Sequence, residues 1–471
     1  MEGIVERYFR RHIPIAPLAV FRVIFGGIML VSIVRFALNG WIYELYVQPD
    51  YFFSFYGFEW VQPLGEPGMY LLFLVMGLSA LFIMLGWHYR VASVLFFLTF
   101  TYVELIDKTN YLNHYYFVSI ISFLLILVPA NRYFSLDLLR KPGLRAEYVP
   151  AWTINIFKLQ LGLVYFFAGT AKLNADWLLN AMPLRIWLPA NADLALIGPL
   201  LEYPATAYLF SWAGAFYDLS LVFFLLYKPT RRYAYAAVVV FHLMTAALFQ
   251  IGMFPYIMIL CTLIYFSAEF HEQIIEKTGD LWRRISFVKR GKIVAGESPA
   301  GTKTFNYRPT VASVLTAVLV IHFVLQLLLP LRFALYPGNL FWTEQGYRFS
   351  WRVMLMEKAG NTTFNVRNPE TGDRWQVSNY QYLTPNQEKM MSTQPDMILQ
   401  FAHYLEEQYQ KEGMDDLQIT AESYVTLNGR RSTLMIDPEV DLTEVEQGFH
   451  HKDWILPFPE NQQSWFGSHR K

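Results

Sequence analysis

Long stretches of apolar residues occupy much of the first 330 residues and limit what the chain can fold into. A helix needs roughly 20 predominantly apolar residues to cross the hydrocarbon core of a bilayer. With 54% hydrophobic and only 16% charged residues, the chain also lacks the composition of a soluble protein. The candidate spans cover residues 17–38, 69–87, 91–106, 115–128, 152–167, 208–227, 233–250, 253–267 and 311–329.

The sequence therefore predicts a polytopic α-helical membrane protein with about eight or nine transmembrane helices. The count stays open because the segments on either side of residues 250–253 fit two crossings or one re-entrant hairpin. The positions of the basic residues favour nine crossings and a cytoplasmic N-terminus, since cytoplasmic loops retain Lys and Arg. In that arrangement the outer loops of the helical part hold only Lys108, Lys172 and Arg185.

Residues 331–471 lack the long apolar stretches of the first 330 residues, and their pattern predicts a separate exoplasmic α+β domain. The segment LQITAESYVTLNGRRSTLMI alternates as strands do, and DMILQFAHYLEEQYQKEG has the spacing of a polar helix. This part contains 13 basic and 19 acidic side chains, so the net charge of zero for the whole chain hides two oppositely charged parts. We expect residues 1–330 to form a transmembrane helical domain and residues 331–471 to form the exoplasmic domain.

Charge, cysteine content and motifs exclude several classes of protein. The 38 basic and 38 acidic residues balance, which excludes a strongly basic nucleic-acid binder. The single cysteine, Cys261, excludes an intrachain disulfide and a thiolate metal cluster. No metal-ligand spacing is present, because His114 and His242 have no His or carboxylate at the i+4 position. We therefore expect no metal site. The sequence also lacks a G-x-S-x-G motif and a P-loop, so we expect neither a triad hydrolase with a standard nucleophile elbow nor a nucleotide-driven pump.

Ionisable residues in or near the predicted spans are rare, and such residues usually face the interior of a helical bundle. For Arg22, Arg35 and Asp218 the simplest interpretation is structural ion pairing or snorkelling toward the interface. His322 is expected to be a packing histidine with satisfied hydrogen bonds. The full set is Arg22, Arg35, Glu104, Asp107, Lys158, Asp218, His242 and His322.

Two polar clusters are predicted at the outer ends of spans. The first, ELIDKTNYLNHYY, carries Asn113 and His114 in the turn between the third and fourth spans. The second, YFFAGTAKLNADWL, carries Lys172 directly after an apolar helix. A lysine at this position is either a snorkelling anchor or, where it is dehydrated, a general base with a neutral amine. The spacing alone leaves both interpretations open.

At these clusters the chain resembles the vitamin K-dependent γ-glutamyl carboxylase family. The DKT…NH and AG..KL.ADW motifs are the most specific parts of the resemblance, which extends from about residue 18 to about residue 456. The matching passages are FRVIFGGIML, YRVASVLFFLTFTYVELIDKTNYLNHYY, VYFFAGTAKLNADW, YDLSLVFFLLYKPTRR, FHLMTAALFQIGMFPY, FSWRVMLMEK and LMIDPEVDL.

The resemblance implies an integral membrane enzyme that oxidises reduced vitamin K with O2 to the 2,3-epoxide and adds CO2 to glutamate side chains. The cofactor would be the hydroquinone of phylloquinone or menaquinone, with no metal. By the same resemblance, Lys172 corresponds to the catalytic lysine that deprotonates the hydroquinone. His114, with its neighbour Asn113, corresponds to the family's active-site histidine, which is tied to the carboxylation of glutamate. The residues that match the quinone-site region are Phe249, Gly252, Met253, Phe254, Tyr347, Trp351 and Met354.

Departures from the family pattern leave parts of this function open. Animal members have a disulfide between the membrane part and the lumenal domain, whereas the single Cys261 predicts docking by packing alone. Animal members also have paired lysines where this chain has Ala171 and Lys172. The chain is shorter at its C-terminus than those enzymes, which leaves a quinol epoxidase or oxidase without protein carboxylation as an alternative. A transporter or receptor-like bundle is the alternative outside enzymes.

The resemblance also sets expectations for location and partners. We expect a prokaryotic-type homologue in the bacterial cytoplasmic membrane, with the active site near the exoplasmic face. The expected partners are the lipid bilayer, a lipid-soluble quinone and a glutamate-containing peptide or protein, and no nucleic acid.

Overall fold

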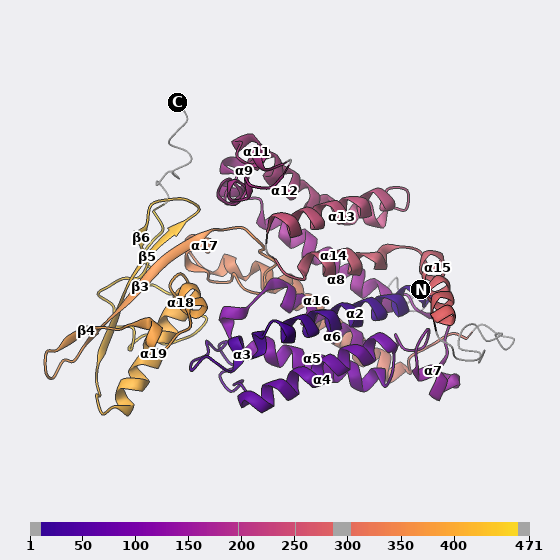
Figure 1. Cartoon of the computed structure of the whole chain (residues 1–471), viewed down its shortest axis with the longest axis horizontal. Helices are drawn as coiled ribbons and strands as arrows, with labels where there is room; N and C mark the ends of the chain where they lie inside the picture. The colour runs from indigo at the N-terminus through magenta and orange to yellow at the C-terminus, as the bar shows by residue number, and fades with distance from the viewer. Residues whose placement is uncertain (1–10, 196, 250, 286–302, 460–471) are drawn as a thin grey trace.

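The structure, a computed structural model, describes residues 11–195, 197–249, 251–285 and 303–459, with the backbone alone for residues 279–285. In the described chain, long helices run side by side along the longest axis of the molecule (Figure 1). A domain that contains strands covers one end of the helices, and the first described residues lie at the opposite end (Figure 1). This arrangement agrees with a helical membrane protein that carries a C-terminal α+β domain.

A helix occupies each of the nine predicted spans. These helices are α2 (Ala16–Leu38), α4 (Gly65–Leu85), α5 (Tyr89–Ile106), α6 (Asn113–Leu127), α8 (Trp152–Ala171), α12 (Pro204–Leu226), α13 (Arg231–Leu248), α14 (Phe254–Cys261) with η4 (Thr262–Tyr265), and α16 (Pro309–Leu328). Other helices lie between them, among them the short helices α3 (Trp41–Tyr46), η1 (Lys108–Asn110), α9 (Ala175–Asn180), α10 (Leu184–Trp187) and η5 (Leu329–Leu335), and the longer α15 (Ala268–Ile285).

The number of helices able to cross a membrane on their own is lower than the predicted eight or nine. Among the described residues, six helices are long and apolar enough, and a bent pair raises the number to seven. The pair joins Phe254–Tyr265 to Ala268–Thr278 at an angle of 117°. Helix α6 has 15 residues, which at 1.5 Å per residue is about 22 Å, short of the roughly 30 Å hydrocarbon core. Helix α13 begins with Arg231 and Arg232, which lower its mean hydropathy.

Helices α2 and α4 pack closely against each other. Gly26 permits this approach, because a Cβ there would lie 2.5 Å from the backbone nitrogen of Met84. Arg22 on α2 is fully buried and donates to the carbonyl oxygens of Ile83, Met84 and Ala130. The predicted ion pair or snorkelling of Arg22 is therefore wrong, because backbone carbonyls at the ends of neighbouring segments satisfy the guanidinium.

The C-terminal domain is built on an antiparallel sheet with the strand order β4-β3-β5-β6. Alternate side chains of β5 are buried, as expected for a strand with one covered face. Helix α19 packs Met397, Phe401 and Leu405 into the same core. The strands are β3 (Lys358–Arg367), β4 (Arg374–Gln376), β5 (Gln418–Leu427) and β6 (Thr433–Leu434), and the helices are α17 (Leu340–Thr343), α18 (Pro385–Met391) and α19 (Pro395–Lys411). A separate small sheet pairs β1 (His12–Pro14) with β2 (Tyr148–Pro150).

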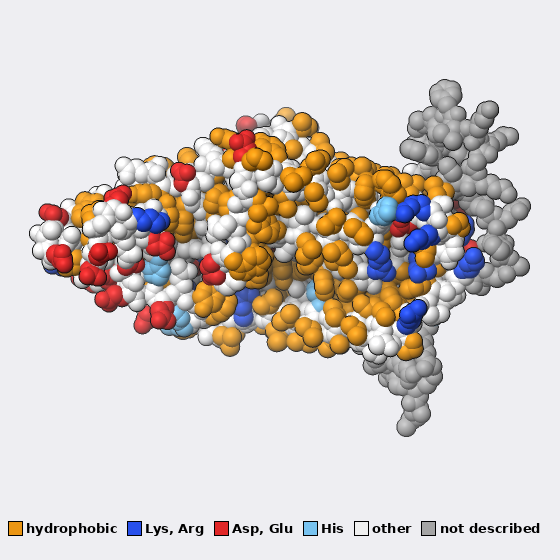
Figure 2. Space-filling view, turned by 90° about the horizontal axis from the view of Figure 1, so that it is seen from below, with side chains coloured by type: hydrophobic (Ala, Val, Ile, Leu, Met, Phe, Trp, Pro, Cys, Tyr) orange, Lys and Arg blue, Asp and Glu red, His pale blue; other side chains and the backbone are white. Residues whose placement is uncertain are grey.

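Apolar and charged side chains divide the surface into zones. Figure 2 shows apolar side chains over the helical part, Lys and Arg gathered toward the end opposite the C-terminal domain, and Asp and Glu gathered on that domain. Large apolar side chains on the helices are exposed, among them Leu98, Phe216 and Phe223. An exposed apolar belt of this kind is expected where lipid replaces water.

The C-terminal domain docks on the helices through polar contacts as well as packing. Cys261 is buried and unbonded, so no disulfide joins the two parts. Tyr51 places its ring 4.1 Å from that of Tyr404, centroid to centroid. In addition, Gln387 Nε2 donates to Asp107 Oδ2 at 3.0 Å, and an ion pair joins Arg430 to Asp176 at 2.6 Å. The expectation of docking by packing alone is therefore wrong.

Candidate active site

A cavity of about 1050 Å³ lies where the C-terminal domain meets the helices. Its lining comes from α2 and α3, from the start of α6, from the turn before α14 and from residues 344–356. Seven of the predicted site residues line it, which are Asn113, His114, Gly252, Met253, Phe254, Tyr347 and Met354. The fold thus brings together segments that lie more than 200 positions apart in the sequence.

Asn113 connects the first turn of α6 to the C-terminal domain. Its Nδ2 donates to the carbonyl oxygen of Arg352 at 2.9 Å, and its Oδ1 accepts a hydrogen bond from the Tyr111 hydroxyl at 3.2 Å. The same hydroxyl accepts the backbone N–H of Phe349 at 2.8 Å. These bonds hold residues 349–352 against the DKTNYLNH turn.

His114 contributes a buried ring to the cavity wall. The imidazole is 9% exposed, and its centroid lies 5.7 Å from that of Phe254. Phe254 begins α14, directly after Gly252 and Met253. Gly252 has a φ of +60°, a left-handed conformation that glycine adopts without strain. The tight turn before α14 therefore brings Met253 and Phe254 beside His114.

The segment of the C-terminal domain that lines the cavity has an unusual backbone. Glu344, Phe349, Trp351 and Met354 all have φ between +55° and +59°. They make up four of the nine non-glycine residues with positive φ in the described chain. Each such residue costs on the order of 1–3 kcal/mol and persists only where surrounding contacts impose it. Strain of this kind is concentrated at binding and catalytic sites.

Three predicted site residues do not line the cavity. Trp351 is 1% exposed, and its ring stacks on that of Tyr116 with 4.9 Å between the centroids. It therefore packs behind the residues that line the cavity. Phe249 is half-buried against Trp187. Lys172 is the third, and it belongs to a separate polar cluster.

Lys172 caps the C-terminal end of α8 and is buried in an ion pair. Its Nζ lies 2.6 Å from Asp218 Oδ2 on α12 and 3.3 Å from the carbonyl oxygen of Ala168. The Trp177 ring lies 5.3 Å away. Lys172 and Asp218 are 7% and 5% exposed, so lysine and partner are both withdrawn from water. This geometry differs from that of a snorkelling anchor, whose ammonium group reaches water.

Aromatic side chains lie between the lysine pair and the cavity. Tyr217 directly precedes Asp218, and its ring centroid lies 6.0 Å from that of Tyr165. The Tyr165 hydroxyl lies 3.2 Å from His242 Nε2, and the His242 centroid lies 5.9 Å from that of the cavity residue Phe254. His242 Nδ1 is buried without a hydrogen-bond partner among the described residues. The Lys172 cluster and the cavity are therefore neighbouring parts of one region.

Charged side chains form one end of the cavity wall. Asp396 Oδ2 lies 2.9 Å from Lys108 Nζ and 2.7 Å from Arg348 Nη1, so one carboxylate bridges two cations. Burial tends to raise the pKa of Asp396, but the charges of Arg348 and Lys108 outweigh it and hold that pKa well below its usual range. Arg352 lines the same wall.

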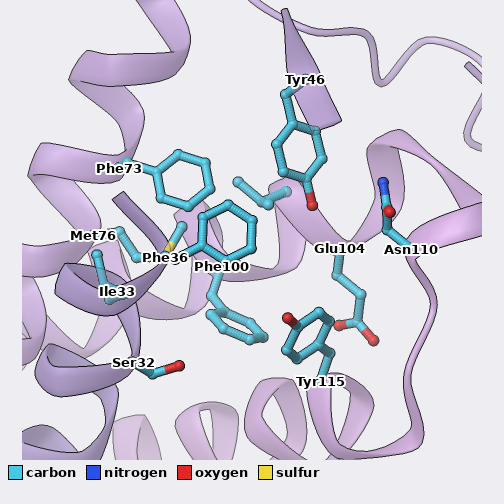
Figure 3. Close-up of a pocket in the computed structure, with 11 residues that line it drawn as sticks. Ser32, Ile33, Phe36, Tyr46, Phe73, Met76, Phe100, Glu104, Asn110 and Tyr115 are labelled. Carbon is cyan, nitrogen blue, oxygen red and sulfur yellow. The ribbon is translucent and has the colours of Figure 1, made fainter. Parts of the chain in front are cut away.

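A smaller apolar cavity adjoins the large one and shares five lining residues with it, which are Ser32, Phe36, Tyr46, Asn110 and Tyr115. Figure 3 shows the Glu104 carboxylate beside Tyr115 at one end of this cavity and the side chains of Phe73 and Met76 at the other. Together the two cavities offer both apolar and polar surface.

Several residues of this region were missed by the sequence interpretation. For Asp218 the prediction was an ion pair or snorkelling; the structure confirms an ion pair, but its partner, Lys172, was not predicted. Arg348 and Arg352 follow no spacing rule, because Arg348 pairs with Asp396 and the backbone carbonyl of Arg352 accepts from Asn113, and both contacts join residues remote in sequence. Within the described residues, no three His, Cys, Asp or Glu side chains are grouped as metal ligands.

Comparisons with known proteins assign both parts of the chain. Residues 10–270 match the HTTM domain family, and residues 311–461 match the family described as vitamin K-dependent gamma-carboxylase, lumenal domain. No solved structure was found to match the chain. Together the two matches cover most of the sequence. The chain therefore belongs to the vitamin K-dependent γ-carboxylase family.

Proposed function

We propose that this protein is a membrane enzyme that couples the O2-dependent epoxidation of reduced vitamin K to the carboxylation of glutamate side chains. The observation that carries the proposal is the cavity that joins Asn113 and His114 to Met253, Phe254 and Tyr347. Its volume of about 1050 Å³ lies just above the range of about 300–1000 Å³ for ligand pockets, enough for a naphthoquinol and a side chain together.

The residues present fit a hydroquinone with an apolar tail. Met253, Phe254 and Met354 offer apolar surface, and His114 offers a polar edge nearby. When bound, reduced vitamin K would supply the electrons for O2 and the strong base that a glutamate γ-proton requires. No side chain of this protein is basic enough to remove that proton. The work of the protein is therefore to bind, to orient and to exclude water.

Lys172 and Asp218 are proposed to move the hydroquinone proton. In the ion pair Lys172 donates to Asp218, so the lysine must first give up a proton to act as a base. Asp218 Oδ2, at 2.6 Å, is the group positioned to accept it. We assign His114 to the carboxylation side, with Asn113 as the residue that fixes the cavity wall beside it.

The proposed orientation follows from the charge zones. The end rich in Lys and Arg is assigned to the cytoplasm, together with the N-terminus (Figure 2). Residues 331–471 would then form an exoplasmic domain on the catalytic transmembrane part, residues 1–330. In this orientation the cavity lies near the exoplasmic face of a bacterial cytoplasmic membrane, within reach of a lipid-soluble quinone and of a glutamate-containing peptide.

The test compares Lys172, the C-cap residue of α8, with Lys158 within that helix. Lys172→Ala in nanodiscs is expected to abolish epoxide formation from reduced menaquinone or phylloquinone in air, whereas Lys158→Ala on α8 leaves it unchanged. Normal epoxide yield from Lys172→Ala would overturn the assignment. Labelled CO2 incorporated into a glutamyl peptide by the wild-type protein separates a carboxylase from an epoxidase that carries out the first half reaction alone.

A further inference from the structure

Arg352 is a buried cation that has no acidic partner in the described part of the chain. Its side chain lines the cavity and is 8% exposed. The guanidinium carbon lies 4.4 Å from the centroid of the Phe333 ring. Its Nε is buried and makes no hydrogen bond with any described residue. Burying an unpaired charge is costly, so such a group is rare without a binding role.

The neighbouring cations Lys108, Arg348 and Lys358 differ from Arg352 in having carboxylate partners. Lys108 and Arg348 share Asp396, and Lys358 Nζ lies 2.7 Å from Glu344 Oε1. Structural ion pairing therefore accounts for these cations and leaves Arg352 without a role. Burial lowers the pKa of Arg352 to about 10, despite an opposing effect of Tyr347, so the side chain stays cationic at neutral pH.

The backbone of Arg352 is held in place by two residues that line the same cavity. Asn113 Nδ2 and the Tyr347 hydroxyl both donate to its carbonyl oxygen, at 2.9 Å and 3.4 Å. The adjacent Trp351 is fixed by its stacking on Tyr116 and has a φ of +59°. Arg352 is therefore presented to the cavity from a constrained backbone, directly beside Asn113.

We propose that Arg352 binds the side-chain carboxylate of a glutamyl residue in this cavity. The inference rests on the proposed carboxylase function and names the group that recognises its substrate. The planar guanidinium matches a carboxylate through two parallel N–H···O bonds. A neutral glutamine side chain cannot supply the missing negative charge. The site therefore selects glutamate by charge, in addition to any contacts with the rest of the peptide.

The same contact assists the reaction. Loss of the γ-proton to the base derived from the quinol leaves an electron pair on the γ-carbon, which delocalises into the carboxylate. That pair then forms the C–C bond to CO2. During the first step negative charge grows on the carboxylate oxygens that Arg352 holds. A cation already placed there stabilises the transition state more than the ground state.

The test measures binding and catalysis separately, in full-length protein in nanodiscs. The probe is a short peptide with a blocked N-terminus and an amidated C-terminus, in which one glutamate is the only charged group. Arg352→Gln is expected to weaken its binding, measured by calorimetry without quinol, by about 30-fold or more. Arg352→Lys is expected to recover part of the lost affinity, because lysine restores the positive charge but cannot form two parallel N–H···O bonds as a guanidinium does. The corresponding glutamine peptide is expected to bind the wild type and Arg352→Gln equally.

Controls separate a binding role from a structural one. Arg367→Gln removes an exposed arginine at the end of β3 and should leave peptide affinity unchanged. Thermal unfolding is followed for each variant. If Arg352→Gln binds the glutamate peptide as tightly as the wild type, the inference is overturned. Equal loss of affinity for the glutamate and glutamine peptides also overturns it, since the arginine would then be structural.

The outcome is distinguishable from failure of the proposed function. If wild-type protein forms epoxide while Arg352→Gln binds the peptide normally, the enzyme assignment stands and the role of Arg352 falls. If the wild type forms no epoxide but glutamate binding depends on Arg352, the carboxylate site stands and the enzyme assignment falls. A rise in the KM for CO2 with unchanged peptide affinity would assign Arg352 to bicarbonate or CO2 and refute the proposal.

Discussion

The ion cluster of Lys108, Asp396 and Arg348 is expected to be the main polar contact that fixes the C-terminal domain over the cavity. Asp396 accepts from Lys108 Nζ at 2.9 Å and from Arg348 Nη1 and Nη2 at 2.7 and 3.3 Å. Lys108 belongs to the helical part, whereas Arg348 and Asp396 come from the C-terminal part. Asp396→Asn removes the only negative charge of the cluster and leaves two cations facing each other.

The expected cost follows from the exposure of the three side chains. Lys108 is 7% exposed, Arg348 15% and Asp396 28%. Breaking a fully buried pair costs about 3–5 kcal/mol, whereas an exposed pair contributes about 0–1 kcal/mol. The cluster lies between these limits but nearer the buried one, and two cations lose their partner. We therefore expect Asp396→Asn to lower the free energy of unfolding by about 2–3 kcal/mol.

The measurement is urea unfolding in nanodiscs, combined with hydrogen exchange of residues 344–356. Asp396→Asn should lower the midpoint and increase exchange in this cavity segment, because Arg348 belongs to it. Asp415→Asn, an exposed site with the same change in charge, is the control and should change stability by less than about 0.5 kcal/mol. If Asp396→Asn changes the free energy of unfolding by less than about 0.5 kcal/mol and leaves hydrogen exchange of residues 344–356 unaltered, the reasoning is refuted.

Acid provides an independent check with a defined sign. The pKa of Asp396 is lower in the folded protein than in the unfolded chain, where it is about 3.9. The stabilisation is therefore fully present well above pH 4 and is lost as the pH falls toward the folded value. The stability difference between wild type and Asp396→Asn should be constant from about pH 6 to 8 and shrink below about pH 4.

Two other predictions test the cavity and the bundle. His114→Ala should lower carboxylation by about 100-fold relative to epoxide, because the two half reactions lose their coupling; an unaltered ratio of the two products would contradict its role. Gly26→Ala should destabilise the bundle by about 1–3 kcal/mol or more, because its Cβ would lie 2.5 Å from Met84 N. Gly27→Ala, whose Cβ would meet Met84 Sδ at 3.5 Å, is the matched control in thermal unfolding. Equal stability of the two variants would contradict the close contact.

The helices were predictable because lipid imposes a local requirement on the sequence. Each apolar stretch satisfies its own backbone hydrogen bonds as a helix, so composition over about 20 residues is sufficient to locate it. The number of crossings was less predictable, because α6 and the bent α14–α15 pair depend on how neighbouring helices shorten or bend a segment. The polar C-terminal part was also recognisable, since alternation and amphipathic spacing are local signals.

The candidate site was only partly predictable. The DKT…NH and AG..KL.ADW motifs pointed to Asn113, His114 and Lys172, yet spacing could not show that Lys172 pairs with Asp218. Those two residues are 46 positions apart on different helices. The single cysteine predicted that the C-terminal domain docks on the helices without a disulfide. The polar contacts between the two parts were not predicted.

The sequence by itself determined a membrane-spanning helical bundle, its acidic C-terminal domain and, through its motifs, the carboxylase family. Only the tertiary structure decided which polar groups meet. It placed Asp396 between Lys108 and Arg348, Asp218 against Lys172, and Arg352 in the cavity wall without an acidic partner in the described chain. The physical reason is that burial raises the cost of every unpaired charge, and pairing depends on distances between segments remote in sequence.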